Sequence, residues 1–197
     1  MTAASDILRF MTAGRPDAEP EAETSDAREA SDAAVAADRQ RVEQLYVRLE
    51  VKLTNVVVRW LWNREEARDV LQEAFVRLWR MRARIDWERV EPLVFRIALN
   101  LAANRRRSRR LWQFVTLSDR AAAPELAGDT GLEQAVQRAI DALPERHRRV
   151  LVMSIHSEMT YGEIGEVLGI SPGTVGSRRN AALHKLRVLL AREDDDD

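Results

Sequence analysis

The strongest structural signal in this 197-residue chain is the stretch TYGEIGEVLGISPGTVGSRRNAALHKL, residues 160–186. Thr160, followed three residues later by Glu163, forms the capping-box pattern that starts a helix. Gly169 ends that helix with a residue that readily adopts a left-handed backbone, and Ser171 provides the cap of a second helix. Two short helices joined by a tight glycine-containing turn are typical of a helix-turn-helix, whose second helix lies in the DNA major groove.

The second helix of this motif has an apolar side and a polar side. Its apolar positions follow the helical period and predict a buried side made of Val175, Ala182, Leu186 and Leu189. The opposite side is small, polar and basic, which suits close approach to DNA and contacts with phosphates. The predicted DNA-contacting residues are Ser171, Gly173, Thr174, Ser177, Arg178, Arg179, Asn180, His184 and Lys185. The alternative is a plain helical hairpin with a charged outer face.

Turn signals divide the chain around this motif. Residues 116–131 contain Pro124, Gly128 and Gly131 without an apolar period, which indicates a linker. The linker separates a carboxyl-terminal unit, residues 132–192, from an amino-terminal unit, residues 39–115. The helices predicted in the carboxyl-terminal unit cover residues 132–142, 145–156, 160–168 and 172–191. An acidic tail, residues 193–197, follows them.

The amino-terminal unit shows three further helical patterns. Apolar residues recur every three or four positions from about residue 39 to Trp60, and again over residues 64–82. A connector over residues 83–90 precedes a third helix that starts near Pro92. Three such helices can share one core, so we expect an all-α protein with a three-helix domain and a four-helix domain. Residues 1–38 lack a lasting apolar period and are predicted to be disordered.

The net charge of −1 conceals a strong asymmetry along the chain. Residues 1–38 carry a net charge of −6, residues 39–117 carry +9, and residues 118–197 carry −4. A basic folded segment between acidic ends is typical of a protein that binds a polyanion, although it can also be a solubilising surface. There is no cysteine and no apolar run near the roughly 20 residues of a membrane span, so we expect a cytoplasmic protein without membrane insertion.

Two helices of the amino-terminal unit carry polar residues at helical spacing. On the second helix, Glu65, Asp69 and Glu73 form an acidic ridge beside Gln72. This ridge can meet basic side chains of a partner, or it can be neutralised within the helix by basic residues such as Arg77. The third helix places polar side chains four residues apart and then a run of arginines, which suits contacts with bases and phosphates; these residues are Arg96, Asn100, Asn104, Arg105, Arg106 and Arg107.

Three motifs in order resemble the extracytoplasmic-function (ECF) group of RNA polymerase sigma factors in the sigma-70 family. RWLWNREEARDVLQEAFVRLWR, residues 59–80, resembles the segment that binds polymerase core. VFRIALNLAANRRR, residues 94–107, is similar to the segment that melts and reads the −10 element. LPERHRRVLVMSIHSEMTYGEIGEVLGISPGTVGSRRNAAL, residues 143–183, looks like the domain that reads the −35 element. The resemblance covers roughly residues 40–190.

The resemblance implies a promoter-specificity subunit without catalytic residues, metal or cofactor. Its partners would be polymerase core (the β′ clamp helices and the β subunit), promoter DNA and an anti-sigma factor. Core binding would fall to Glu65, Asp69, Gln72, Glu73 and Arg77. Promoter melting would use the third-helix residues together with Trp87, whose ring could stack on an extruded base or could equally be a core residue.

Two other classes of function compete with this interpretation. A helix-turn-helix regulator that never joins polymerase would explain residues 132–191 but leave residues 59–80 without a role. An enzyme with a helical carboxylate metal site would need a Glu-x-x-His pair on facing helices. His147, His156 and His184 are scattered along the sequence and do not complete such a pair.

Overall fold

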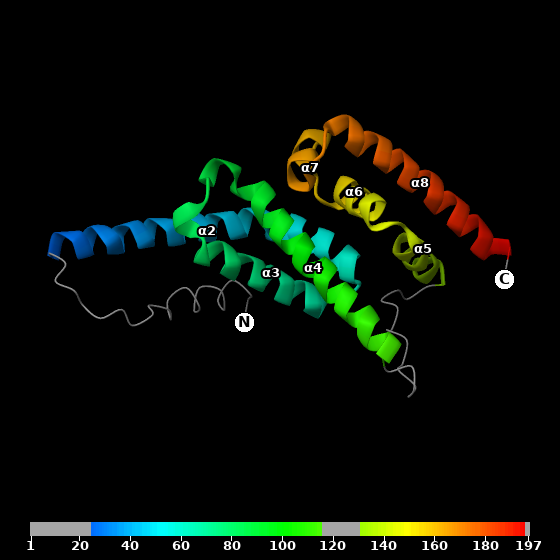
Figure 1. Ribbon diagram of the computed structural model, residues 1–197, viewed down its shortest axis with the longest axis horizontal. Helices are drawn as coiled ribbons and strands as arrows, with labels where there is room; N and C mark the ends of the chain where they lie inside the picture. The colour runs from blue at the N-terminus through cyan, green and yellow to red at the C-terminus, as the bar shows by residue number, and fades with distance from the viewer. Residues whose placement is uncertain (1–24, 116–130, 196–197) are drawn as a thin grey trace.

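The computed structural model describes residues 25–115 and 131–195, and within these ranges the protein is built from helices without strands (Figure 1). The predicted all-α class is confirmed. Residues 116–130, almost the whole predicted linker, lie outside the described residues, as do residues 1–24 of the predicted disordered segment.

The first domain consists of three long helices. They are α2 (Ser25–Leu61), α3 (Arg64–Arg80) and α4 (Val90–Val115). Asn63 stabilises the start of α3 at the corner with α2, because its side chain accepts a hydrogen bond from Glu66 N at 2.9 Å and caps the helix. The apolar stripes of the three helices form one core, and in it the rings of Tyr46 and Phe75 meet edge to face at 5.0 Å.

The prediction that residues 1–38 are disordered is wrong for its last part. Helix α2 begins at Ser25, so residues 25–38 continue the helix that was expected to start near residue 39. These residues lack an apolar stripe, but they include six alanines, which have the highest helix propensity. Val35 packs against the core, which gives the extension a tertiary anchor.

The connector between α3 and α4 is not fully irregular. It contains two short 3-10 helices, η1 (Arg82–Arg84) and η2 (Trp87–Arg89). Asp86 caps η2 by accepting a hydrogen bond from Glu88 N at 2.9 Å. The third long helix starts at Val90, two residues before the predicted Pro92.

The second domain contains the four helices that the sequence predicts. They are α5 (Gly131–Ala142), α6 (Glu145–His156), α7 (Tyr161–Leu168) and α8 (Pro172–Asp195). Because α8 extends to Asp195, the first residues of the predicted acidic tail belong to this helix. Val175 and Ala182 are buried, and Leu186 and Leu189 pack beside Leu143, as their spacing predicts.

The helix-turn-helix has the predicted caps. Thr160 and Glu163 form a reciprocal capping box, and Gly169 ends α7 with φ of 67°. Ser171 Oγ accepts a hydrogen bond from Thr174 N at 3.2 Å and so caps α8. The turn is tight, because a Cβ on Gly165 would lie 2.5 Å from the carbonyl oxygen of Ile170.

The two domains pack against each other. Helices α6 and α7 lie along α2 and α4 (Figure 1), and Val150 and Met153 of α6 belong to the same buried cluster as Trp60 of α2. Ile164 and Val167 of α7 join that cluster as well. The apolar core of the first domain is therefore continuous with part of the second.

Phe75→Ala should lower the free energy of unfolding by about 3–5 kcal/mol, because it removes a fully buried ring and leaves a cavity. Urea denaturation followed by circular dichroism measures the change. Val51→Ala is the matched control, because Val51 on α2 is 68% exposed and its truncation should change stability by less than about 0.5 kcal/mol. Equal effects of the two substitutions would contradict the described core.

Gly165→Ala should destabilise the second domain by about 1–3 kcal/mol, because the new methyl group overlaps the Ile170 carbonyl. Gly162→Ala, three residues earlier in α7, meets no atom closer than Thr160 Oγ1 at 3.7 Å. It should be neutral or stabilise by up to about 1 kcal/mol, since alanine restricts the unfolded chain. Thermal melts of both variants make the comparison, and a stable Gly165→Ala protein would show that the turn is looser than described.

Candidate polymerase and nucleic-acid interfaces

The acidic ridge of α3 lies on one side of the helix. Glu65 and Asp69 are exposed, Gln72 and Glu73 are half-buried, and Arg77 is exposed one turn beyond. The Asp69 side chain is 64% exposed. The predicted polymerase-binding residues therefore share a continuous accessible strip on α3.

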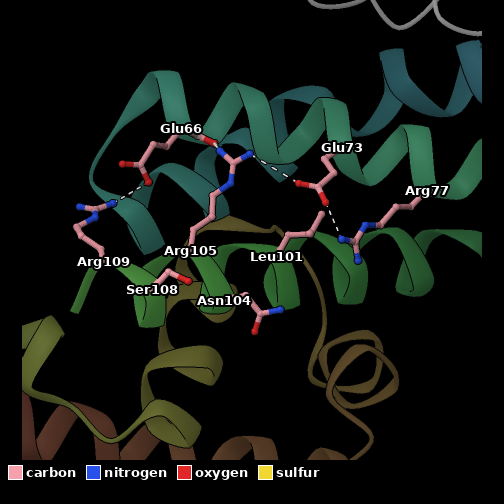
Figure 2. A pocket seen from close by; sticks show the side chains of 8 residues that line it. All are labelled: Glu66, Glu73, Arg77, Leu101, Asn104, Arg105, Ser108 and Arg109. Carbon is pink, nitrogen blue, oxygen red and sulfur yellow. Dashed lines mark hydrogen bonds and ion pairs between the residues drawn. The ribbon is translucent and has the colours of Figure 1, made fainter. Parts of the chain in front are cut away.

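This ridge is partly neutralised by the chain's own arginines. Glu73 accepts a hydrogen bond from Arg77 at 2.6 Å, as the intrahelical alternative predicts. Arg105 of α4 lies 3.5 Å from Asp69 and 3.7 Å from Glu73, so a residue predicted to bind DNA also contacts the ridge. Figure 2 shows Glu73, Arg77 and Arg105 at an open pocket between α3 and α4. The pocket is lined by Glu66, Glu73, Arg77, Leu101, Asn104, Arg105, Ser108 and Arg109.

The polar residues of α4 fall on separate sides of the helix. The exposed face carries Arg96, Asn100, Asn104 and Arg107. Because successive residues rotate by about 100°, these four positions lie within one quarter of the helix circumference. They form the accessible face that the predicted −10 contacts require.

Arg106 is not on that face. Its side chain is 13% exposed, donates a hydrogen bond to the carbonyl oxygen of Trp60 at 3.3 Å, and forms an ion pair with Asp141 of α5. The structure thus separates Arg106 from Arg107, although the two residues are adjacent in the predicted phosphate-binding run.

Trp87 lies in η2 and is half-buried. Its ring packs against the core cluster, and the guanidinium of Arg41 lies 5.5 Å from the ring centroid. A cation over an aromatic face is attracted by the ring quadrupole. Base stacking and core packing are therefore both compatible with the position of Trp87, because the ring contributes to the core and is still partly accessible.

The amino-terminal end of α8 presents the predicted −35 contacts. Gly173, Ser177, Asn180 and His184 are all exposed, as their spacing predicts. Ser171 and Lys185 are exposed, while Thr174, Arg178 and Arg179 are half-buried. A Cβ on Gly173 would meet no atom within 4 Å, so the surface in front of the helix start is open.

The pKa of His147, a buried histidine of α6, is lowered by its surroundings. Burial lowers the pKa of His147 on α6, and the positive charges of Arg146, Lys185 and Arg178 lower it further. Burial is the largest cause, and two of the three cations that add to it belong to α8. Burial, with a smaller contribution from Arg59, also lowers the pKa of His156.

The metal-site alternative gains no support. In residues 25–115 and 131–195, no group of three or more His, Asp or Glu side chains is arranged to hold a metal ion. Over the same part of the chain, no helix has the length and apolar character that crossing a membrane requires.

Sequence reasoning missed the polar residues at the domain boundary. Trp62, Asp141, Arg148 and Arg149 all make contacts between the domains. Their partners are distant in sequence, so no local pattern singles them out. The only local signal is the pair of tryptophans at Trp60 and Trp62, an unusual density of aromatic surface at the end of a helix.

Models of two sigma-70 regions match this chain. The model of "Sigma-70 region 2" matches residues 45–111, which cover most of α2, α3 and α4. The model of "Sigma-70, region 4" matches residues 139–188, which include the helix-turn-helix. The region 2 match disfavours a regulator that never joins polymerase, because such a regulator has no use for that region.

Named relatives agree with these models over most of the chain. RNA polymerase sigma factor CarQ of Myxococcus xanthus is 30% identical over 153 residues, which cover 75% of this chain and 88% of CarQ. The ECF RNA polymerase sigma factor SigL of Mycobacterium tuberculosis is 29% identical over 165 residues, 80% of this chain and 93% of SigL.

A solved structure has the same fold. It is the sigma factor RpoE of Bartonella quintana in complex with the anti-sigma factor NepR, with a TM-score of 0.57, 19% identity, and coverage of 76% of this chain and 96% of RpoE. Sigma factors are transcription initiation factors rather than catalysts. On these matches, the chain belongs to the ECF group of the sigma-70 family and is an alternative sigma factor that directs transcription initiation.

Proposed function

We propose that three helices of this sigma factor have three separate binding functions. The acidic strip on α3 binds the β′ clamp helices of polymerase core, the exposed face of α4 binds and melts the −10 element, and the start of α8 reads the −35 element. The observation that carries the proposal is the simultaneous exposure of the three sets of polar residues on separate helices.

The α3 strip suits a basic partner surface. Glu65 and Asp69 are exposed, and the ion pairs that Asp69 and Glu73 make with Arg105 are long, at 3.5 and 3.7 Å. Exposed pairs of this kind contribute about 0–1 kcal/mol, so a partner's basic side chains can replace them at little cost. Gln72 and Arg77 flank the same strip and would add hydrogen bonds.

The −10 contacts combine bases and phosphates. Asn100 and Asn104 can donate to and accept from base edges, while Arg96 and Arg107 hold the backbone. Arg105 contributes from the edge of this face, where it already reaches α3. Trp87 would stack on an unpaired base, since stacking on an aromatic ring is worth about 1–3 kcal/mol per base.

The −35 contacts lie at the amino-terminal end of α8. Exposed Ser177, Asn180 and His184 face the groove, and Arg178, Arg179 and Lys185 bind phosphates. Ser171, Gly173 and Thr174 allow the helix end to approach a phosphate closely.

The remaining partners follow from the family. A regulatory anti-sigma factor would hold this chain inactive, as the complex of RpoE with NepR suggests by analogy. The β subunit would complete the contacts with core. We also propose that the protein works in the cytoplasm and has no catalytic activity or cofactor of its own, so the chemistry of RNA synthesis belongs to polymerase.

Asp69→Lys should weaken binding to sigma-free core polymerase at least tenfold, because like charges then face each other across the interface. Gel filtration with purified core measures binding, and run-off transcription on a genomic template library reads out initiation and both promoter elements. Glu43→Lys makes the same charge change on another helix, α2, and should retain activity. If the unaltered chain neither binds core nor starts RNA synthesis at defined sites, the proposed function is wrong.

Arg178→Ala and Asn180→Ala should affect promoter binding in different ways. Loss of a phosphate contact lowers affinity for all sequences and reduces the slope of log K against log salt by about 0.9. Loss of a base contact at Asn180 should cost about 1–3 kcal/mol on the preferred −35 sequence only. Fluorescence anisotropy with cognate and scrambled duplexes, titrated with salt, separates the two effects. Identical behaviour of the two variants would refute the assignment.

A further inference from the structure

One carboxylate of the second domain sits among donors of the first. Asp141 Oδ1, at the end of α5, accepts a hydrogen bond from Trp62 Nε1 at 3.3 Å and forms an ion pair with Arg106. Arg148 of α6, in its own domain, lies 3.6 Å from the same oxygen. A single anionic oxygen is therefore held by an indole N–H and a guanidinium from the opposite domain.

The residues around Asp141 and Arg106 distinguish their ion pair from one on the protein surface. Trp60 is fully buried at the boundary, and the Arg148 guanidinium lies 4.7 Å from its ring centroid. Arg106 also donates to the Trp60 carbonyl oxygen at the end of α2. Partial burial strengthens the charge interaction and makes the loss of either partner costly.

The donor Trp62 is positioned by an unusual backbone. Its φ of 55° lies in the left-handed region, which residues other than glycine rarely adopt, and Trp62 N donates to the carbonyl oxygen of Val58 at 2.6 Å. This conformation turns the chain from α2 toward α3 and leaves the indole N–H beside Asp141. Strained residues of this kind are concentrated at functional positions.

The domain contact also reaches the face of α4 that bears the polar residues. Arg149 of α6 donates to Asn100 Oδ1 at 3.4 Å, and Lys52 of α2 pairs with Glu158 at 3.2 Å. The second domain thus contacts one residue, Asn100, of the otherwise exposed surface that the proposed function gives to promoter DNA.

We propose that Arg106 and Trp62 form a binding site for a DNA phosphate, and that Asp141 fills this site when the two domains are closed. A phosphodiester oxygen has the same charge and accepts the same hydrogen bonds as the carboxylate oxygen it would replace. The inference rests on the proposed function, because it takes promoter DNA as the competing ligand. Closure of the domains and binding of DNA are then mutually exclusive at Arg106.

Because closure of the domains and binding of DNA compete for Arg106, each process weakens the other. DNA opens the domains by the same factor by which closure weakens DNA binding. The apparent affinity of the free chain for DNA is reduced by the fraction of molecules that are open. Weakening the closed state should therefore strengthen DNA binding without any new contact to DNA.

Domain opening can be measured directly, because the chain contains no cysteine. Val47→Cys on α2 and Val188→Cys on α8 introduce labels at exposed positions, one in each domain. Distances between the labels, from spin-label or fluorescence energy-transfer measurements on the full chain, report closure. Asp141→Asn should shift the distribution to longer distances, because Arg106 loses its anionic partner and gains by returning to water. Circular dichroism checks that the variant is folded.

Glu91→Gln is the matched control. It removes one negative charge and an ion pair of 2.7 Å with Arg48, but both residues belong to the first domain. On a promoter duplex, Asp141→Asn should bind about tenfold more tightly than Glu91→Gln, within the usual range of coupling between sites. This comparison cancels the general effect of the lost charge on DNA affinity.

Arg106→Gln separates a DNA contact from a purely structural role. It should open the domains as Asp141→Asn does. It should nevertheless bind DNA more weakly than Asp141→Asn, because the side chain proposed to bind the phosphate is lost. Unchanged label distances in Asp141→Asn would overturn the proposal, and so would equal DNA affinities of the two opened variants. A chain that opens as expected but fails to start transcription with core would instead contradict the proposed function.

Discussion

The burial of Trp60 is the constraint on which the arrangement of this protein depends. Its ring lies in the last turn of α2, belongs to the core of the first domain, and contacts the Arg148 guanidinium of the second. Val150 and Met153 of α6 belong to the same buried cluster, so α6 packs against the end of α2 that carries this ring. The same packing brings Asp141 to Arg106, so the polar contacts between the domains follow from an apolar one.

Helix geometry divides one basic run into parts with different surroundings. Arg105 and Arg109 of α4 turn toward α3, where they meet Asp69, Glu73 and Glu66. Arg106 turns toward the second domain, and Arg107 turns to solvent. Because each residue advances about 100° around the axis, Arg105, Arg106 and Arg107 point in different directions. The arginines of this run look alike in the sequence, but in the fold they have different electrostatic surroundings.

The difference between local and distant contacts explains how much of the structure the sequence could predict. Caps and apolar periods are local, so the helices, the capping box at Thr160 and the exposed side of α8 all followed from neighbouring residues. The partners of Arg106 and Arg105 on other helices lie more than 30 residues away, and no local rule selects them. The helix over residues 25–38 was missed for a different reason, since its propensity comes from alanine rather than from an apolar stripe.

The ion pairs also differ in how readily a partner can replace them. The pairs between α4 and α3 involve side chains that are 30–64% exposed, where water competes and the net contribution is about 0–1 kcal/mol. They leave the acidic strip available for the polymerase contact that we propose. Arg106 is far less exposed, so separating it from Asp141 requires that another anion take its place or that the domains open to water. The domain boundary is therefore the costlier contact to break, while the acidic strip of α3 can exchange its partners at little cost.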